Sequence, residues 1–306
     1  MHAGDHLASA GATGRDDAAQ GALDVSHVTE SARIKEARLI AWLRQQGAVL
    51  VGFSGGVDSA YLACVAVEAL GPERAVAVIG RSASYPASQW ETARAVAHRF
   101  GVPVLEVDTE EMADPRYAAN PSNRCYFCKS ELWTRLADVA RDRGLNAVLD
   151  GSNADDVGDH RPGAVAATEN AVRSPLLEAG LTKAEIREWS RELGLPTWDQ
   201  PAAPCLASRI PYGIAVTPER LRQVETAELG LRALGFRDFR VRHHDGLARL
   251  EVHPAEIARV AEHRRQIEAA VRAAGFRRVL IDLQGYRRGS LNEGLAGAQL
   301  VQLGAW

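Results

Sequence analysis

The sequence lacks any apolar run near the roughly 18 residues that a membrane-spanning helix requires, so we expect no role in a membrane. It also lacks an excess of positive charge. The formal net charge of −3 gives no overall reason to expect a nucleic-acid partner. Cysteine is scarce as well, because four cysteines in 306 residues are too few for a disulfide scaffold. These cysteines are therefore candidates for thiol or metal chemistry.

The N-terminal segment lacks the features of a signal peptide. Residues 1–30 are rich in Ala, Gly, Asp and Ser, with neither a basic start nor an apolar stretch. We interpret them as a disordered leader and expect a cytoplasmic protein. The whole chain has 46% hydrophobic and 25% charged residues, which is typical of a globular protein, and its length allows one large domain or two.

Short apolar segments alternate with segments of helical periodicity between residues 31 and 212. This alternation predicts an α/β domain with a doubly wound parallel sheet, covered by helices on both faces. Ligands of such sheets bind beyond the carboxyl ends of the strands, where the polar segments 54–59, 81–84 and 150–156 lie. The predicted strands are 48–53, 75–79, 102–107, 147–149 and 172–176, and the predicted helices are 31–46, 57–70, 89–100 and 129–143.

A different pattern after about Tyr212 predicts a smaller α+β domain, residues 213–306, for substrate binding and oligomerisation. We expect a homo-oligomer. Thr217 and Pro218 are typical of a helix start, and the Asp245-Gly246 pair is typical of a hairpin turn. The predicted helices are 218–235 and 254–274, the predicted strands are 239–241, 250–252 and 279–283, and the proline-rich segment 196–218 is the expected hinge.

A glycine turn, Ser54-Gly55-Gly56-Val57-Asp58-Ser59, joins the first strand to its helix. Glycine lets the backbone approach a ligand, and the unpaired N–H groups of a helix start favour an anion. Ser54 and Ser59 add hydroxyl donors, and Asp58 fits if it holds a metal ion or orients the loop. The stretch matches neither Gly-x-x-x-x-Gly-Lys-Ser/Thr nor Gly-x-Gly-x-x-Gly. The alternative is a turn that binds no ligand.

These six residues resemble the pyrophosphate loop (PP-loop) of the ATP pyrophosphatase superfamily, whose members cleave ATP between the α and β phosphates and pass AMP to a substrate oxygen. The resemblance implies that ATP and Mg²⁺ bind here, with Asp58 and either Asp155 or Asp156 as metal ligands. A solvated acidic turn is an equally good interpretation of Asp155 and Asp156. The expected nucleotide-binding residues are Ser54, Gly55, Gly56, Asp58, Ser59, Ser84, Gly151 and Asn153.

The four cysteines fall into two groups. Cys64 lies within the helix after the loop, where free cysteine packs as a small apolar residue. Cys125 and Cys128 form a Cys-x-x-Cys just before a predicted helix, which fits a redox dithiol, half of a zinc site or two ligands of an iron–sulfur cluster. A closed zinc site needs four ligands, and no second Cys-x-x-Cys supplies them. With Cys205, a three-cysteine site would leave one iron of a 4Fe-4S cluster open for a ligand such as sulfide.

Four motifs together resemble the LarE family of sulfur transferases, over residues 31–292. This family converts the carboxylates of a pyridinium dicarboxylate mononucleotide into thiocarboxylates, on the way to a nickel-pincer nucleotide cofactor. Some members sacrifice the sulfur of a single cysteine at the position of Cys205, and others carry two further cysteines and a 4Fe-4S cluster that delivers sulfide. The motifs are the PP-loop, residues 150–156, residues 205–213 and residues 282–292.

Cys125 and Cys128 make this sequence similar to the cluster type, which implies a 4Fe-4S cluster held by these two residues and Cys205. The implied partners are the mononucleotide substrate and sulfide or another sulfur donor. An acyl-adenylate would make AMP the leaving group, with the loop stabilising the departing pyrophosphate. Cys205, Asp58 and Arg209 are the expected catalytic residues.

Arginine side chains are suited to a substrate with two carboxylates and a phosphate. Arg240 and Arg242 share one face of a predicted strand, and Arg249 is the third expected substrate ligand, with a solvated surface as its alternative.

Three other functions are compatible with the PP-loop. They are a PP-loop tRNA thiolase, an ammonia-using ligase similar to NAD⁺ or GMP synthetase, and a nucleotide-binding sensor without turnover.

Overall fold

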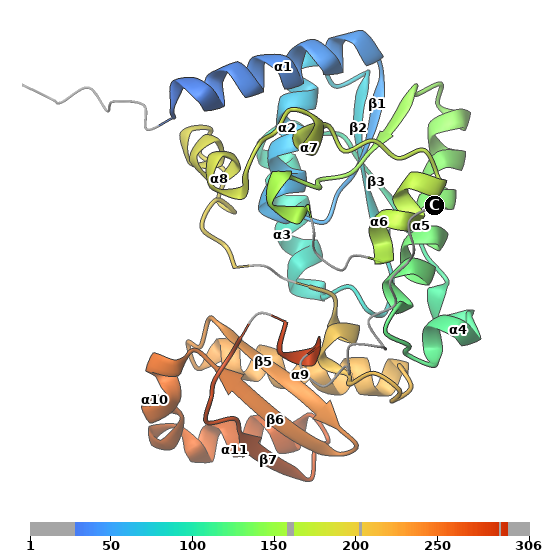
Figure 1. Ribbon diagram of the computed structural model, residues 1–306. Coiled ribbons are helices and arrows are strands. Elements are labelled where there is room, and N and C mark those ends of the chain that lie inside the picture. The colour runs from blue at the N-terminus through green and yellow to red at the C-terminus, as the bar shows by residue number, and fades with distance from the viewer. Residues whose placement is uncertain (1–27, 158–161, 202–203, 288, 293–306) are drawn as a thin grey trace, which may run out of the picture.

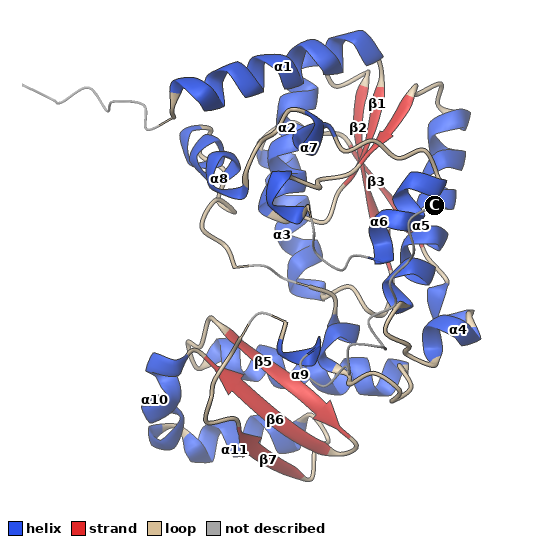
Figure 2. Ribbon diagram, viewed as in Figure 1, coloured by secondary structure: helices blue, strands red, loops and turns tan. Residues whose placement is uncertain are grey.

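Two β-sheets organise the computed structural model, which describes residues 28–157, 162–201, 204–287 and 289–292 (Figures 1 and 2). The first sheet has four parallel strands in the order β3-β2-β1-β4, and the second has three strands in the order β5-β6-β7. The strands of the first sheet are β1 (Val49–Gly52), β2 (Ala75–Arg81), β3 (Val104–Asp108) and β4 (Ala147–Leu149). The helices of this unit are α1 (Glu30–Gln46), α2 (Val57–Leu70), α3 (Ala87–Arg99), α4 (Pro115–Ala118), α5 (Arg124–Asp142), α6 (Pro162–Glu169), α7 (Pro175–Glu178) and α8 (Lys183–Glu192).

Alternate residues of β1 pack on opposite sides of the first sheet. Val49 and Val51 belong to a core formed with α1, α2, α3 and α8, whereas Leu50 packs with α5 and α6 on the other face (Figure 1). A buried parallel sheet with helices on both faces is the doubly wound α/β fold, as the sequence predicted.

The chain turns back between two neighbouring strands of this sheet. It runs outward from β1 through β2 to β3 and then returns to place β4 on the other side of β1. The reversal between β1 and β4 is a topological switch point, where open α/β sheets bind their ligands.

The predicted fifth strand, 172–176, is wrong. Only Arg173 forms a bridge, with Leu149, and Pro175 starts helix α7 instead. Proline favours the first position of a helix because its ring fixes a helical φ and its missing N–H needs no partner there. Helix α5 also begins earlier than predicted, so Cys125 and Cys128 lie inside its first turns.

The smaller unit contains helix α9 and the second sheet. Thr217 caps α9 by accepting a hydrogen bond from the Arg220 N–H, and Asp245 and Gly246 form the predicted turn with φ of 44° and 86°. The expected long helix 254–274 is interrupted at His263. The elements are α9 (Pro218–Ala233), β5 (Phe239–His244), β6 (Leu247–Val252), α10 (Ile257–Glu262), α11 (Arg264–Ala273) and β7 (Arg278–Ile281).

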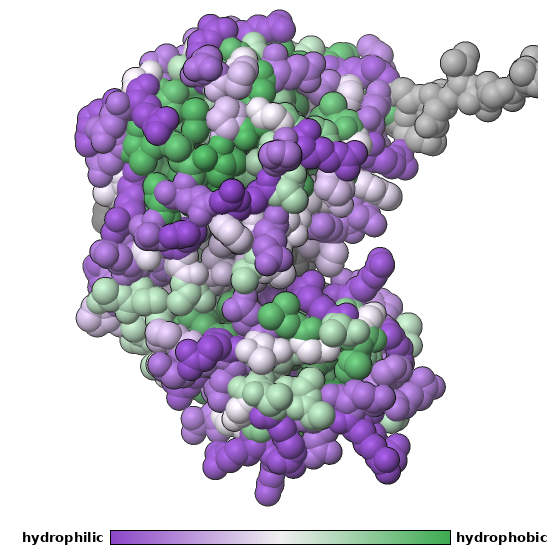
Figure 3. Space-filling view, turned by 180° about the vertical axis from the view of Figure 1, so that it is seen from behind, coloured by the Kyte–Doolittle hydropathy of each residue, from purple (hydrophilic) through white to green (hydrophobic). Residues whose placement is uncertain are grey.

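The core of the smaller unit also takes in side chains of the larger one. Tyr117 of α4 is buried within it, and Phe127 and Cys128 of α5 pack against it. Much of the rear surface is hydrophilic, with apolar side chains gathered on one part of the larger unit (Figure 3). Across the described ranges, no helix combines the length and the apolar character needed to cross a bilayer.

Candidate active site

The PP-loop follows β1 at the switch point and leads into the N-terminus of α2. Gly56 is the N-cap residue of α2, and no side chain caps this helix start. The first N–H groups of α2 are therefore available to an anion, and the helix dipole favours negative charge at the same place.

Hydroxyl groups hold the loop in shape. The Ser59 hydroxyl donates to the Gly56 carbonyl at 3.1 Å and accepts from the Ser54 N–H at 3.2 Å. The Ser54 hydroxyl lies 3.2 Å from the Ser59 hydroxyl and accepts from the Gly56 N–H at 3.4 Å. Ser59 is buried and Ser54 is exposed, so Ser54 is the hydroxyl that a bound phosphate would meet first.

Two glycines let other segments come close to this loop. Gly55 has φ of 71°, and a Cβ atom there would lie 2.7 Å from the Cβ of Ala93 in α3. A Cβ atom on Gly151, after β4, would lie 3.1 Å from the Ser59 nitrogen. The loops after β1 and β4 therefore meet in one place, as expected at a switch point.

Asp58 forms an ion pair with Lys183, the first residue of α8, and accepts a hydrogen bond from the Asn153 side chain at 3.3 Å. Sequence reasoning missed Lys183. Its only local signal is the capping box of Thr182 and Glu185, which marks a helix start but does not show which loop that helix faces. The ion pair places a cation beside the loop in addition to the helix dipole.

Asp155 and Asp156 take part in local structure. The Asp155 carboxylate accepts from the Lys183 N–H at 2.9 Å and so caps α8, and the Asp156 carboxylate accepts from the Asn153 N–H at 3.0 Å. These contacts favour the acidic-turn interpretation, and the magnesium role of the two residues stays a prediction. No group of three or more His, Cys, Asp or Glu within the described ranges is arranged to hold a metal ion.

Residues 84–89 connect the PP-loop with Cys205. The Tyr85 hydroxyl and the Gln89 amide each donate to the Ser54 carbonyl at 2.9 Å. The Ser84 carbonyl accepts from the Leu206 N–H at 2.8 Å, next to Cys205. One short segment thus contacts both the expected nucleotide site and the expected sulfur site.

A buried carboxylate lies behind this segment. Glu111 is 2% exposed and accepts a hydrogen bond from the Ser84 hydroxyl at 3.1 Å, while its second carboxylate oxygen has no partner within the described ranges. The negative charge of Glu111 helps to raise the pKa of Cys128, behind the larger effect of burial. Sequence reasoning missed this residue, because nothing local distinguishes it from its acidic neighbours.

The three expected cluster ligands come from two distant segments. Cys125 and Cys128 lie on α5, and Cys205 lies in the connection between the two units, which is formed by the described residues 204–217. Cys125 is exposed as a residue, yet burial around its sulfur raises the pKa of the thiol, and the nearby Cys205 raises it further. Burial likewise raises the pKa of Cys128. The sulfurs are therefore close enough for each to affect the ionisation of another, and any metal must displace thiol protons.

The remaining cysteine fits the expected core role. Cys64 lies on α2 and packs, partly buried, against the core, and burial raises the pKa of its thiol to about 12. A thiol with so high a pKa carries little of the reactive thiolate near neutral pH.

Arg209 uses its donors on the protein itself. It is 2% exposed and forms a two-pronged ion pair with Glu228, at 2.9 and 3.0 Å. Its other terminal nitrogen donates to the carbonyls of Pro204 and Cys205, at 2.6 and 3.1 Å. These contacts hold the backbone at Cys205, and the catalytic role expected for Arg209 stays a prediction.

The expected substrate arginines are mostly buried. Arg242 donates to Glu251 at 2.8 and 3.0 Å and to the Ser208 carbonyl at 2.8 Å, and Arg240 lies over the Tyr286 ring. Arg249 pairs with the other oxygen of Glu251 and keeps about a third of its side chain exposed. Of the three, Arg249 is therefore the most accessible to a substrate, and the substrate roles stay predictions.

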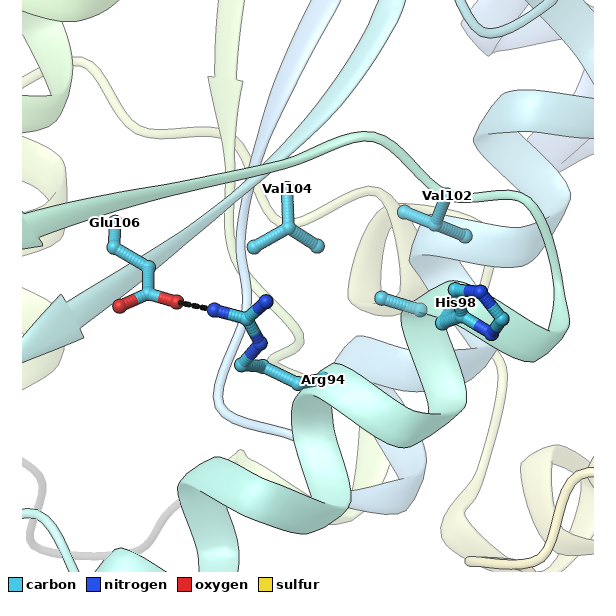
Figure 4. Close-up of a pocket in the computed structure, with 6 residues that line it drawn as sticks. Arg94, His98, Val102, Val104 and Glu106 are labelled. Atoms are coloured by element: carbon cyan, nitrogen blue, oxygen red, sulfur yellow. Dashed lines mark hydrogen bonds and ion pairs between the residues drawn. The ribbon is translucent and has the colours of Figure 1, made fainter.

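A cavity of about 180 Å³ lies outside this site (Figure 4). It is lined by the α3 residues Arg94, Ala97 and His98 and by Val102, Val104 and Glu106. Arg94 donates to Glu106 at 2.8 Å across it. Val102 precedes β3 and Val104 begins it, whereas the PP-loop follows the carboxyl end of β1, with β2 between these two parallel strands.

Comparisons with known proteins agree with this geometry. A family model for NAD synthase matches residues 38–136, which include the PP-loop. The chain is 36% identical to pyridinium-3,5-bisthiocarboxylic acid mononucleotide synthase of Lactiplantibacillus plantarum, over 87% of this chain and 97% of that protein. It is 46% identical to an uncharacterized protein of Synechocystis, over 79% of this chain and 91% of the relative. A match to the NH₃-dependent NAD⁺ synthetase of Methanococcoides burtonii covers only 25% of this chain, at 38% identity.

The parallel sheet, the uncapped helix start and the serine-glycine loop define an ATP-using enzyme of the PP-loop superfamily. Because the similarity to the mononucleotide synthase extends over nearly the whole of that relative, the chain belongs to the LarE family.

Proposed function

We propose that the protein inserts sulfur into pyridinium-3,5-dicarboxylic acid mononucleotide and that ATP activates the carboxylate. The observation that carries this proposal is the contact of residues 84–89 with both the PP-loop and the segment of Cys205. An acyl-adenylate formed at the loop would then lie near the sulfur that must replace AMP. The full-length similarity to the mononucleotide synthase supports the same chemistry.

The loop residues supply the activation step. A carboxylate is a poor electrophile because its oxygen would leave as oxide, whereas AMP is a good leaving group. The first N–H groups of α2, the Ser54 hydroxyl and Lys183 supply the donors and positive charge that a departing pyrophosphate needs. Asp58 is the residue we propose for Mg²⁺, which would supply further positive charge beside the loop.

Cys125, Cys128 and Cys205 are the residues we propose to hold a 4Fe-4S cluster. Burial raises the pKa of both α5 thiols and Cys205 raises it further, so the three sulfurs lie near one another, as three ligands of one cluster would. When bound, the cluster would supply sulfide at its unligated iron.

A reaction with defined products tests this function. Protein purified without oxygen would be mixed with ATP, Mg²⁺, sulfide and the dicarboxylate mononucleotide. We expect AMP, pyrophosphate and a thiocarboxylate, identified by chromatography and mass spectrometry. Asp58→Ala should abolish pyrophosphate release while leaving the circular dichroism spectrum unchanged.

Each rival function has its own outcome in the same experiment. ADP as the product would contradict the PP-loop chemistry. An amide formed from ammonia would indicate a ligase, and turnover only with tRNA would indicate a tRNA thiolase. ATP binding with no product under any condition would favour the nucleotide-binding sensor without turnover.

A further inference from the structure

The three cysteines can act together only if α5 is held against the connection that carries Cys205. About eighty residues separate Cys128 from Cys205, including the whole of β4 and α6 to α8. The positions of the three sulfurs are therefore set by tertiary contacts between α5 and the connection. Residues just before the Cys-x-x-Cys provide those contacts.

Asn120 is at the centre of these contacts. It is fully buried, and its side-chain amide nitrogen lies 3.2, 2.8 and 2.8 Å from the carbonyl oxygens of Ile210, Pro211 and Ile214. The backbone carbonyl of Asn120 accepts a hydrogen bond from the Gly213 N–H at 2.9 Å. One residue thus holds the backbone of the connection just after Cys205 at four points.

The backbone of Asn120 is unusual as well. Its φ is 57°, in the left-handed region that asparagine tolerates better than most residues with a side chain. Glycine would fit this backbone but would lack the amide. Asn120 therefore combines a left-handed backbone with a fully used buried amide, and it serves these contacts as well as the turn.

Arg124 completes the set of contacts. It is 3% exposed, and its terminal nitrogen donates to the Asn120 side-chain oxygen. Its guanidinium lies 5.2 Å from the ring centroid of Tyr212 in the connection. Since Arg124 directly precedes Cys125, these contacts tie the start of α5 to the same backbone that Asn120 holds.

We propose that Asn120 and Arg124 form a clasp that brings Cys205 against Cys125 and Cys128. They are positioning residues, because they act on the sulfur atoms through the backbone of the connection and the first turn of α5. The clasp stands on the contacts of the protein alone. Its importance for sulfur transfer rests on the proposed function.

Chemical cross-linking of the metal-free protein measures this geometry directly. Reduced protein would be treated with a short bismaleimide, and the linked peptides would be quantified by mass spectrometry. In the wild type we expect links between Cys205 and either cysteine of α5. Asn120→Gly keeps the left-handed backbone and removes the amide, and we expect it to reduce these links about tenfold, the factor that corresponds to about 1.4 kcal/mol.

The chain contains its own controls. The link between Cys125 and Cys128 lies within one helix, so it should form equally in all variants. Val224→Ala removes a fully buried side chain from the core of the smaller unit without touching the clasp. It should lower the melting temperature and leave the Cys205 links unchanged. Undiminished Cys205 links in Asn120→Gly, or an equal loss in Val224→Ala, would overturn the proposal.

A second measurement separates the clasp from the proposed function. Iron would be reconstituted into the wild type, Arg124→Lys and Arg124→Gln, and read by absorption and iron assay. We expect retained iron to fall in the order wild type, Arg124→Lys, Arg124→Gln, because lysine keeps the charge without the planar fork. Equal iron in all three would contradict the role of Arg124. Normal cross-linking with no iron bound even by the wild type would instead count against the cluster and leave the clasp intact.

Discussion

Asp58 brings a negative charge into a loop whose other features favour phosphate, and Lys183 offsets that charge. The two residues form an ion pair in which each side chain is less than half exposed, with Asn153 as a further donor to Asp58. Without the lysine, Asp58 would repel the phosphates of ATP. We therefore predict that Lys183 favours nucleotide binding by neutralising Asp58.

The change Lys183→Met tests this role while keeping the length of the side chain. Loss of one charge-assisted contact costs about 1.5–3 kcal/mol, so we expect kcat/KM for ATP to fall by about tenfold to a hundredfold. Pyrophosphate release measured against ATP concentration gives this value. Lys35→Met is the matched control. Lys35 lies on α1 and pairs with Glu185 of α8, the helix that also carries Lys183, but this ion pair does not involve Asp58. Equal ATP kinetics in both variants would show that Lys183 is a structural residue.

Gly55 shows how the packing of whole elements restricts a single residue. Gly55 lies between β1 and α2, and α3 packs directly against it. Ala93 of α3 leaves no room for a Cβ atom on Gly55. We expect Gly55→Ala to destabilise the fold by about 1–2 kcal/mol for its left-handed backbone and by about 1–3 kcal/mol for the overlap. Urea unfolding measures the sum.

Gly56→Ala is the control for this element. Gly56 has φ of −74°, and a Cβ atom there would meet only the Ser54 hydroxyl, at 3.5 Å. Its free energy of unfolding should fall by only about 0.5–1 kcal/mol, the difference between glycine and alanine at an N-cap. If Gly55→Ala were no more destabilising, the approach of α3 would not constrain the loop.

Patterns in short stretches of sequence predicted helices and strands well where neighbouring residues alone determine the structure. The apolar segment 147–149 is β4 with the predicted bounds, and the Thr217-Pro218 pair begins α9. The segment 172–176 failed because its apolar residues contact the core without forming a strand, and Pro175 starts a helix. Periodicity detects burial, but it does not distinguish a short buried strand from another buried segment.

The candidate site was predictable only in part, for the same reason. The PP-loop is contiguous, so its six residues are visible together in the sequence. Lys183, Glu111 and Asn120 are isolated residues whose roles depend on contacts with segments far away in the chain. Arg242 was predicted as a substrate ligand, but the sequence could not show that Glu251 and Ser208 use its donors.

At the scale of the whole molecule, one segment joins the expected nucleotide site to the expected sulfur site, and a second segment holds the sulfur site itself in place. Residues 84–89 hold the PP-loop and the Leu206 backbone, and Asn120 holds the connection after Cys205. Cys128 and Cys205 also pack against the core of the smaller unit. A change in how the two units pack would therefore alter the positions of the sulfurs relative to the PP-loop.

The cluster hypothesis and the sacrifice of Cys205 predict different proteins after turnover. If three cysteines hold a 4Fe-4S cluster, protein made without oxygen should be brown and contain about four irons per chain. With added sulfide it should turn over repeatedly, and Cys205 should keep its mass. Ser at Cys125, Cys128 or Cys205 should remove the iron, whereas Cys64→Ser should retain it, because Cys64 packs in a separate core. A colourless protein that reacts once and loses the mass of H₂S at Cys205 would exclude the cluster but not the sulfur transfer, since both routes release AMP at the same step.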